Sequence, residues 1–187
     1  FSTQHLIDAG HRRIGFVSGD LSRLSFKQRL EGYTKTLSRN GIPVDETLIT
    51  SFGIEEGYRQ VRSLLEKEKP TAIFCTNDIN ALHGYRASHA LKLRVPNDVS
   101  IVGFDDIWSA AIAAPPLTTI RVYKEELGSI GVRMLLNTIT GDIKQPTNTI
   151  VPVRFVARES VLDLNIKQNQ KEDNKIVADS EEVESIS

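Results

Sequence analysis

Polar, charged and aromatic side chains follow several short apolar runs of the sequence, and together they have the chemistry to bind a polyol. These side chains belong to Arg23, Ser25, Arg29, Phe52, Asn77 and Asp105. A carboxylate accepts hydrogen bonds from neighbouring hydroxyls, a guanidinium donates to ring and hydroxyl oxygens, and an aromatic ring covers the C–H face of a sugar. Taken alone, Arg29 is equally well explained as a solvated helix arginine and Phe52 as a core aromatic. Their common placement after apolar runs favours a binding site.

The adjacent carboxylates of Asp105 and Asp106 suggest general acid–base chemistry at first sight. Side chains of adjacent residues after a strand diverge, so a cooperating catalytic pair is not expected. Two interpretations remain. One or both carboxylates cap a helix that begins near Ile107, or Asp105 binds a ligand. The position of Asp105 directly after a buried run favours ligand binding.

Motifs of the common enzyme classes are absent from the sequence, which has no G-x-S-x-G elbow, P-loop or G-x-G-x-x-G loop. The histidines have no partner at the spacing of helical metal ligands, and there is no second cysteine to help them. They are His5, His11, His83 and His89. We therefore expect a chain that is not an enzyme and that needs no metal or cofactor.

Short apolar runs alternate with amphipathic segments along most of the chain. The pattern predicts strands at 14–17, 48–52, 72–76, 99–104 and 150–156, and helices at 2–9, 26–37, 58–65, 78–85 and 127–140. Asn77 and Asp78 together cap the predicted helix that carries Ile79, Leu82 and Tyr85, and Asp78 has the side chain expected at the N-cap. This alternation predicts an α/β fold with a doubly wound parallel sheet and helices on both faces. Such sheets bind ligands at the carboxyl ends of their strands.

The composition is that of an ordinary globular domain, with 40% hydrophobic and 25% charged residues among 187. The net charge of −1 is unlike that of a domain that binds a nucleic-acid backbone. The single cysteine, Cys75, lies in an apolar run and is interpreted as a buried hydrophobe, which suits a reducing cytoplasm. The sequence has no apolar stretch of the ~18 residues that a membrane span needs. Because the chain opens at Phe1 directly into a helical pattern, we interpret it as part of a longer protein.

The segment 163–187 differs from the rest in composition. Three lysines stand against seven acidic residues, no aromatic residue occurs, and apolar residues follow no period. Such a composition favours a tail without fixed structure. The alternative is an assembly helix seeded by Ile176 and Val183, but a single heptad gives little support for a coiled coil.

Four motifs follow one another along the chain: GHRRIGFVSG at 10–19, TNDINA at 76–81, LRVPNDVSIVGFDD at 93–106 and PPLTTI at 115–120. In sequence and order they resemble motifs of the lactose/galactose-repressor (LacI/GalR) family of transcriptional regulators. The resemblance runs from about Phe1 to Glu159. It implies a helix-turn-helix headpiece, a hinge helix and a two-lobed core shaped like a periplasmic sugar-binding protein, with the effector between the lobes.

By this resemblance, residues 1–120 form the C-terminal lobe and 121–145 cross into the N-terminal lobe. Residues 146–162 return as a strand, and 163–187 follow as the tail. The headpiece, the hinge and most of the N-terminal lobe would lie outside the chain. Operator DNA would therefore be bound by parts that this chain does not include, and the regulator would act as a homodimer in the cytoplasm, with no membrane contact.

The resemblance also assigns roles to the candidate residues. Arg29 corresponds to an arginine that binds effector hydroxyls or an acidic effector group, and Asp105 to an acidic residue that accepts from the effector. Asn77 corresponds to a polar contact and Phe52 to an aromatic wall. Arg23 and Ser25 lie in a loop that makes further contacts in some members of the family.

The identity of the effector is left open by the sequence. A hexose, a disaccharide or a sugar phosphate all suit Arg29 and Asp105, whereas a purine suits them less well. The main alternative function is a periplasmic-type sugar-binding transport protein, which shares the two-lobed fold. The sequence that precedes Phe1 would distinguish them, since a regulator has a helix-turn-helix there and a transport protein has a signal segment.

Overall fold

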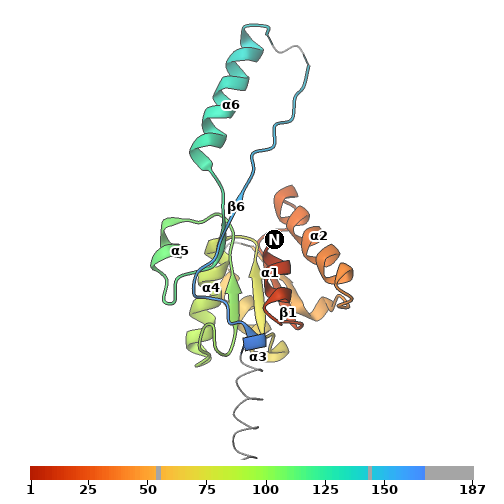
Figure 1. The fold of residues 1–187 in the computed structure, drawn as a ribbon, viewed down its shortest axis with the longest axis vertical. Coiled ribbons are helices and arrows are strands. Elements are labelled where there is room, and N and C mark those ends of the chain that lie inside the picture. Colours follow the sequence, from red (N-terminus) through yellow and green to blue (C-terminus); the bar gives the residue numbers. More distant parts are fainter. Residues whose placement is uncertain (54–55, 143–144, 167–187) are drawn as a thin grey trace, which may run out of the picture.

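Parallel strands form the centre of the computed structural model, which describes residues 1–53, 56–142 and 145–166 (Figure 1). The strands are β1 (Ile14–Ser18), β2 (Ile49–Ser51), β3 (Ala72–Cys75) and β4 (Ser100–Val102). They form a 4-stranded sheet in the order β2-β1-β3-β4, and all of its pairs are parallel. β1, β3 and β4 are buried along their whole length, as expected of parallel strands whose two faces are covered, whereas the edge strand β2 is only partly buried. The predicted doubly wound α/β fold is confirmed.

Helices cover both faces of this sheet. They are α1 (Ser2–Asp8), α2 (Leu24–Arg39), α3 (Gly57–Glu68), α4 (Asp78–Ala90) and α5 (Trp108–Ile112), with the short 3-10 helix η1 (Glu46–Leu48) before β2. On one face, residues of α1 and α2 pack on Phe16 and Phe74, and the ring of Tyr33 lies 5.1 Å from that of Phe16. On the other face, residues of α3 and α4 pack on Val17, Ile73 and Ile101.

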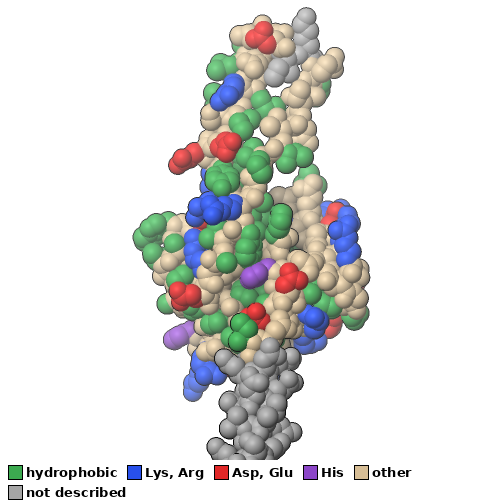
Figure 2. Space-filling model, in the orientation of Figure 1, with side chains coloured by type: hydrophobic (Ala, Val, Ile, Leu, Met, Phe, Trp, Pro, Cys, Tyr) green, Lys and Arg blue, Asp and Glu red, His purple; other side chains and the backbone are tan. Residues whose placement is uncertain are grey.

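The chain leaves this body through β5 (Thr119–Arg121) and returns through β6 (Arg154–Val156), which pair antiparallel. The predicted strand 150–156 is therefore shorter than expected, and it joins β5 in a separate 2-stranded sheet. Between the two strands, α6 (Lys124–Ile139) projects away from the body (Figure 1). None of its residues is buried, and apolar side chains lie along it in Figure 2. Among the described helices, none is long and apolar enough to cross a membrane.

The segment that follows β6 is tied to the sheet by hydrogen bonds. Ser160 is fully buried: its hydroxyl donates to the carbonyl of Ile101 at 2.6 Å and accepts from the amide of Thr118 at 2.8 Å. The ring of His11, only 1% exposed, donates from Nε2 to the carbonyl of Leu162 at 3.1 Å. These contacts join the two ends of the described chain.

The start of the predicted tail is also bound to the body. The amide of Leu164 donates to the carbonyl of Ala9 at 2.8 Å, and the side chain of Asn165 donates to the carbonyl of Asp8 at 2.8 Å. The prediction of a loose tail from residue 163 is thus wrong for residues 163–166, because composition does not report such backbone contacts. The rest of the expected tail, 167–187, lies outside the described residues.

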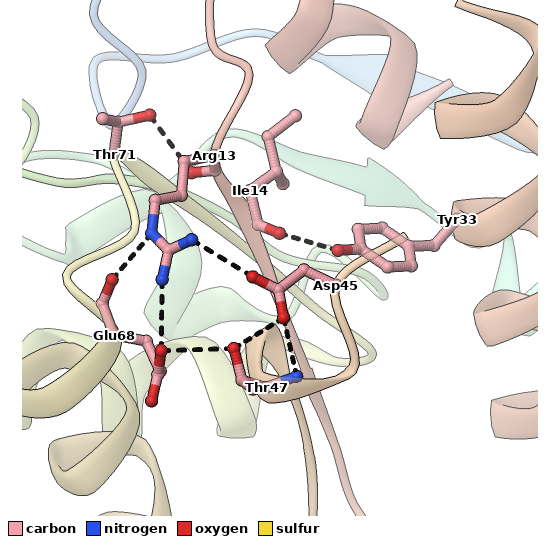
Figure 3. Close-up of polar contacts among 7 residues, drawn as sticks. All are labelled: Arg13, Ile14, Tyr33, Asp45, Thr47, Glu68 and Thr71. Atoms are coloured by element: carbon pink, nitrogen blue, oxygen red, sulfur yellow. Dashed lines mark hydrogen bonds and ion pairs between the residues drawn. The ribbon is translucent and has the colours of Figure 1, made fainter. Parts of the chain in front are cut away.

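A polar cluster lies just before β1, at the amino ends of the strands, and Figure 3 shows its side chains. Arg13 pairs with Asp45 at 3.2 Å and with Glu68 at 3.1 Å. Asp45 also accepts from the amide of Thr47 and so caps η1. This cluster joins the amino end of β1 to η1 and to α3, far from the carboxyl ends of the strands.

Candidate functional site

A pocket of about 440 Å³ opens where the carboxyl ends of β1, β2 and β3 meet. Because β2 lies on one side of β1 and β3 on the other, the loops that follow these strands separate and leave a crevice. Arg23, Phe52 and Asn77 line this pocket, as the sequence predicted for strand-end residues. The remaining lining residues are Gly19, Asp20, Phe26, Gly53, Ile79, Asn80 and His83.

Aromatic rings form one wall of the pocket. The ring of Phe52, 8% exposed, meets the ring of His83 edge-on, with centroids 6.5 Å apart. Gly57 makes this packing possible, because a Cβ there would lie 2.7 Å from His83 Cδ2 and 2.9 Å from Phe52 Cε2. Burial, followed by the charge of Arg86, lowers the pKa of His83, so its imidazole is neutral near pH 7. The wall suits a ligand with a flat, apolar face.

Asn77 holds the polar end of the pocket. It is the N-cap of α4, and its Oδ1 accepts from the amide of Asn80 at 2.8 Å. The prediction of Asp78 as the N-cap is wrong. The fully buried carboxylate of Asp78 instead accepts from the hydroxyl of Thr119 at 2.6 Å and from the amide of Ile107 at 2.8 Å. Asp78 therefore joins α4 to the two segments that follow β4.

Arg29 is fixed beside the pocket by three contacts. Its guanidinium donates to the carbonyl of Thr76 at 2.6 Å, and its Cζ lies 3.7 Å from the centroid of the Phe104 ring and 5.7 Å from that of Phe26. Arg29 lines a separate, smaller cavity of about 170 Å³ between α1 and α2. Burial lowers the pKa of Arg29, and the charge of Asp105 opposes that shift.

Asp105 follows β4 in a strained conformation. Its φ of 110° and the φ of 48° at Asp106 lie in the left-handed region that non-glycine residues rarely adopt. Burial raises the pKa of Asp105, and the charges of Arg29 and Lys124 oppose the increase. The carboxylate of Asp105 is thus half-buried among cations at the carboxyl edge of the sheet.

The alternative interpretation of Asp105 and Asp106 as helix caps is wrong. The N-cap of α5 is Ile107, and no side chain caps the helix. Asp106 pairs instead with Arg121 at 2.6 Å and with Arg158 at 2.7 Å. Burial alone would raise the pKa of Asp106, but these hydrogen bonds and charges outweigh it and hold the pKa below the usual value.

Of the two residues predicted to bind from the loop, Arg23 and Ser25, only Arg23 lines the pocket. Arg23 is the N-terminal cap residue of α2 and lines the pocket, with its Cζ 5.9 Å from the centroid of the Phe26 ring. Ser25 is exposed in the first turn of α2 and is not among the residues that line the pocket. His83 and Asn80 were missed by the sequence analysis. Both follow Asn77 at helical spacing, which could have indicated that they share its side of α4.

The described side chains at this edge suit reversible binding of a polar ligand with an apolar face. They supply guanidinium donors, amide and carboxylate acceptors and an aromatic wall. Among the described residues, no group of three or more His, Cys, Asp or Glu could hold a metal ion. The fold and the site together define a ligand-binding domain of the doubly wound class.

Comparison with known proteins narrows this class. Residues 3–161 match the family model of the periplasmic binding protein-like domain, and the chain belongs to that family. Within it, the relatives and structural neighbours are regulators of the lactose-repressor type, as the sequence motifs indicated.

Two curated relatives and two solved structures show the extent of this similarity. An HTH-type transcriptional repressor PurR from Mannheimia succiniciproducens is 40% identical over 162 residues, which are 84% of this chain and 48% of the relative. The PurR repressor of Haemophilus influenzae is 37% identical over 166 residues, 86% of this chain and 49% of the relative. The chain thus spans about half the length of the curated relatives it matches.

Among solved structures, the transcriptional regulator CelR in complex with cellobiose has a TM-score of 0.81 at 34% identity, over 84% of this chain and 49% of the other. The lac repressor dimer bound to operator and the anti-inducer ONPF has a TM-score of 0.77 at 34% identity, over 86% of this chain and 56% of the other.

Proposed function

We propose that this chain is the effector-sensing region of a transcriptional repressor and that it binds a sugar or sugar phosphate at the carboxyl edge of its sheet. The observation that carries the proposal is the pocket lined by Arg23, Phe52 and Asn77. Arg29, which lines the smaller cavity, and Asp105, which follows β4, are outside this lining, at the same carboxyl edge of the sheet. The carboxylate and guanidinium groups suit hydroxyl and phosphate groups, and the aromatic wall suits the apolar face of a sugar ring.

The division of the chain into lobes is part of this proposal. Residues 1–120 and the return segment 146–162 would form the C-terminal lobe, and residues 121–145 would belong to the N-terminal lobe of the whole regulator. The projecting helix α6, which has no buried residue, supports this division. An effector between the lobes would change their separation, a hinge motion that shifts the population able to bind operator DNA.

Operator DNA would be bound by a headpiece outside these 187 residues, which agrees with the net charge of −1. The whole regulator would act as a homodimer in the cytoplasm, because palindromic operators are read by dimers. The relatives and structural neighbours are transcriptional repressors, which favours a repressor over a transport protein. We propose binding rather than catalysis, since the residues around the pocket are donors, acceptors and aromatic rings.

A substitution at Asp105 in the full-length regulator tests this proposal. Asp105→Ala is expected to abolish release from (or recruitment to) operator DNA in response to effector, while DNA binding without effector is kept. Asp45→Ala is the matched control, since Asp45 lies at the other end of the sheet (Figure 3). An unchanged response in Asp105→Ala would contradict the site assignment.

The effector class is tested by thermal unfolding with cellobiose, glucose and glucose 6-phosphate. A compound that binds only the folded state raises the unfolding temperature with its concentration. The increase should disappear in Asp105→Ala and persist in Asp45→Ala.

A further inference from the structure

Asp106 contacts both segments through which the chain leaves and re-enters the body. Its Oδ2 accepts from Arg121 on β5 at 2.6 Å, and its Oδ1 accepts from Arg158, which follows β6, at 2.7 Å. The Asp106 side chain is only 5% exposed. One buried carboxylate therefore joins the outgoing and the returning segment.

Arg158 extends these contacts to the start of β5. Its guanidinium also donates to the carbonyl of Leu117 at 2.8 Å, and its amide donates to the hydroxyl of Thr118 at 3.0 Å. The side chain of Arg158 is 16% exposed, so it has few alternative partners in solvent. The spacing of β5 and the return segment thus depends on Arg158 and on the carboxylate that it contacts.

Hydrogen bonds to β5 and to Asp78 hold the strained backbone at Asp105. The amide of Asp105 donates to the carbonyl of Ile120 at 2.8 Å, and the amide of Ile107 donates to Asp78 at 2.8 Å. Two successive left-handed non-glycine residues persist only when their surroundings determine them. Here those surroundings are β5, Asp78 and the two arginines that pair with Asp106.

We propose that Asp106 is a positioning residue that couples the orientation of Asp105 to the spacing of β5 and the return segment. The inference rests on the proposed function, in which Asp105 binds effector. A change in the separation of β5 and the return segment alters how Asp105 is presented to the ligand. Because such coupling acts in both directions, a ligand bound to Asp105 favours one arrangement of β5 and the return segment.

The test is amide hydrogen exchange of the full chain, compared between the unchanged protein and Asp106→Asn. Asp106→Asn is expected to accelerate exchange at the amides of Asp105 and Gly103 by about tenfold or more, since both donate to the segment around β5. The amides of β1 and β3 should keep their rates. Uniform acceleration across the chain would show a purely structural role, and an unchanged rate at Asp105 would also overturn the proposal.

Asp45→Asn is the matched control, because it removes an aspartate–arginine pair at the far end of the sheet (Figure 3). It should leave the exchange rates at Asp105 and Gly103 unchanged. Acceleration there in the control would show that these amides respond to any loss of an ion pair, and the assignment to Asp106 would fall.

A milder pair of variants covers the case in which Asp106→Asn does not fold. Arg121 is 42% exposed, so its substitution disturbs packing less. Arg121→Gln should accelerate exchange at Asp105, and Arg121→Lys, which keeps the charge, should restore most of the protection. Equal rates in the two variants would overturn the proposal. Hydrogen exchange is measured without effector. Its result therefore tests the role of Asp106 separately from the proposed effector binding.

Discussion

The guanidinium of Arg29 lies over the ring of Phe104, with Cζ 3.7 Å from the ring centroid, while it donates to the carbonyl of Thr76 at 2.6 Å. The side chain therefore joins the residues that follow β3 and β4. A lysine keeps the charge but has no planar group to stack and donate at once.

Arg29→Lys is expected to lower the free energy of unfolding by about 1–2 kcal/mol, the size of a partly desolvated cation–π contact together with a hydrogen bond. Urea unfolding measures the loss. Arg39→Lys, at the exposed end of α2, is the control and should change the free energy by less than about 0.5 kcal/mol. Equal losses in both variants would show that the contacts of Arg29 contribute nothing specific.

The buried imidazole of His11 should make the stability of the protein depend on pH. Burial lowers the pKa of His11, an effect that the Leu162 carbonyl and Asp163 oppose and that Arg12 strengthens. The unfolded chain therefore binds more protons than the folded chain just below the ordinary value of 6.5. Stability should be full above that pH and should fall as the pH decreases through it toward the folded-state pKa. His5, whose pKa burial also lowers, adds to the same trend.

Urea unfolding at pH 5, 6, 7 and 8 measures this dependence. His11→Gln should be less stable at pH 8, because the contacts with Thr71 and Leu162 are disturbed, and its stability should depend less on pH. His89→Gln, at an exposed position, should keep the slope of the unchanged protein. A slope that survives in His11→Gln would assign the pH dependence to other groups.

Even a methyl side chain at Gly103 should lower the stability of the protein. A Cβ at this position would overlap Asp78 Oδ1 and lie 2.9 Å from Leu117 Cδ2. Gly103→Ala should therefore lower the free energy of unfolding by about 1–3 kcal/mol, the usual cost of overpacking. In contrast, Gly32→Ala within α2, where a Cβ meets nothing within 4 Å, should raise it by up to about 1 kcal/mol. Denaturant unfolding of both variants gives the comparison.

Removal of the His83 side chain should weaken effector binding and leave the stability of the protein nearly unchanged. Its ring lines the pocket and is only partly buried. His83→Ala should weaken effector binding by roughly tenfold, about the loss of one hydrogen bond or ring contact, and should leave the unfolding temperature without ligand within a few degrees. Calorimetric titration measures the affinity once the effector class is known. Tyr58→Phe is a suitable control, since Tyr58 contacts Arg86 outside the pocket lining.

The strands and helices of the body were predictable because their signals are local. Buried parallel strands such as Ile14–Ser18 and Ala72–Cys75 are apolar on both faces, and α2 shows its core face through residues such as Tyr33 and Leu37. Family motifs then indicated which strand ends carry the site. The pocket confirms that Arg23, Phe52 and Asn77 lie together, whereas their roles in binding stay predictions.

The roles of adjacent acidic and amide residues were not predictable, since they depend on distant partners. Asn77 and Asp78 both suit an N-cap, and the choice is made by Thr119 and the Ile107 amide, which take the carboxylate of Asp78. In the same way, Arg158 comes from a segment 52 residues beyond Asp106. Neither pairing leaves a periodic signal in the sequence.

The return of the chain at Ser160 and Leu162 has a consequence for how the protein is made. A ribosome that has added residues 1–150 has already made β1 to β5, yet the amides of Ile101 and Thr118 still lack their acceptors on Ser160. The imidazole of His11 also lacks one of its two partners, the carbonyl of Leu162, which lies 151 residues further along the chain. The sheet therefore gains these hydrogen bonds only after Leu162 has been made, and completion of the fold depends on contacts between distant parts of the chain.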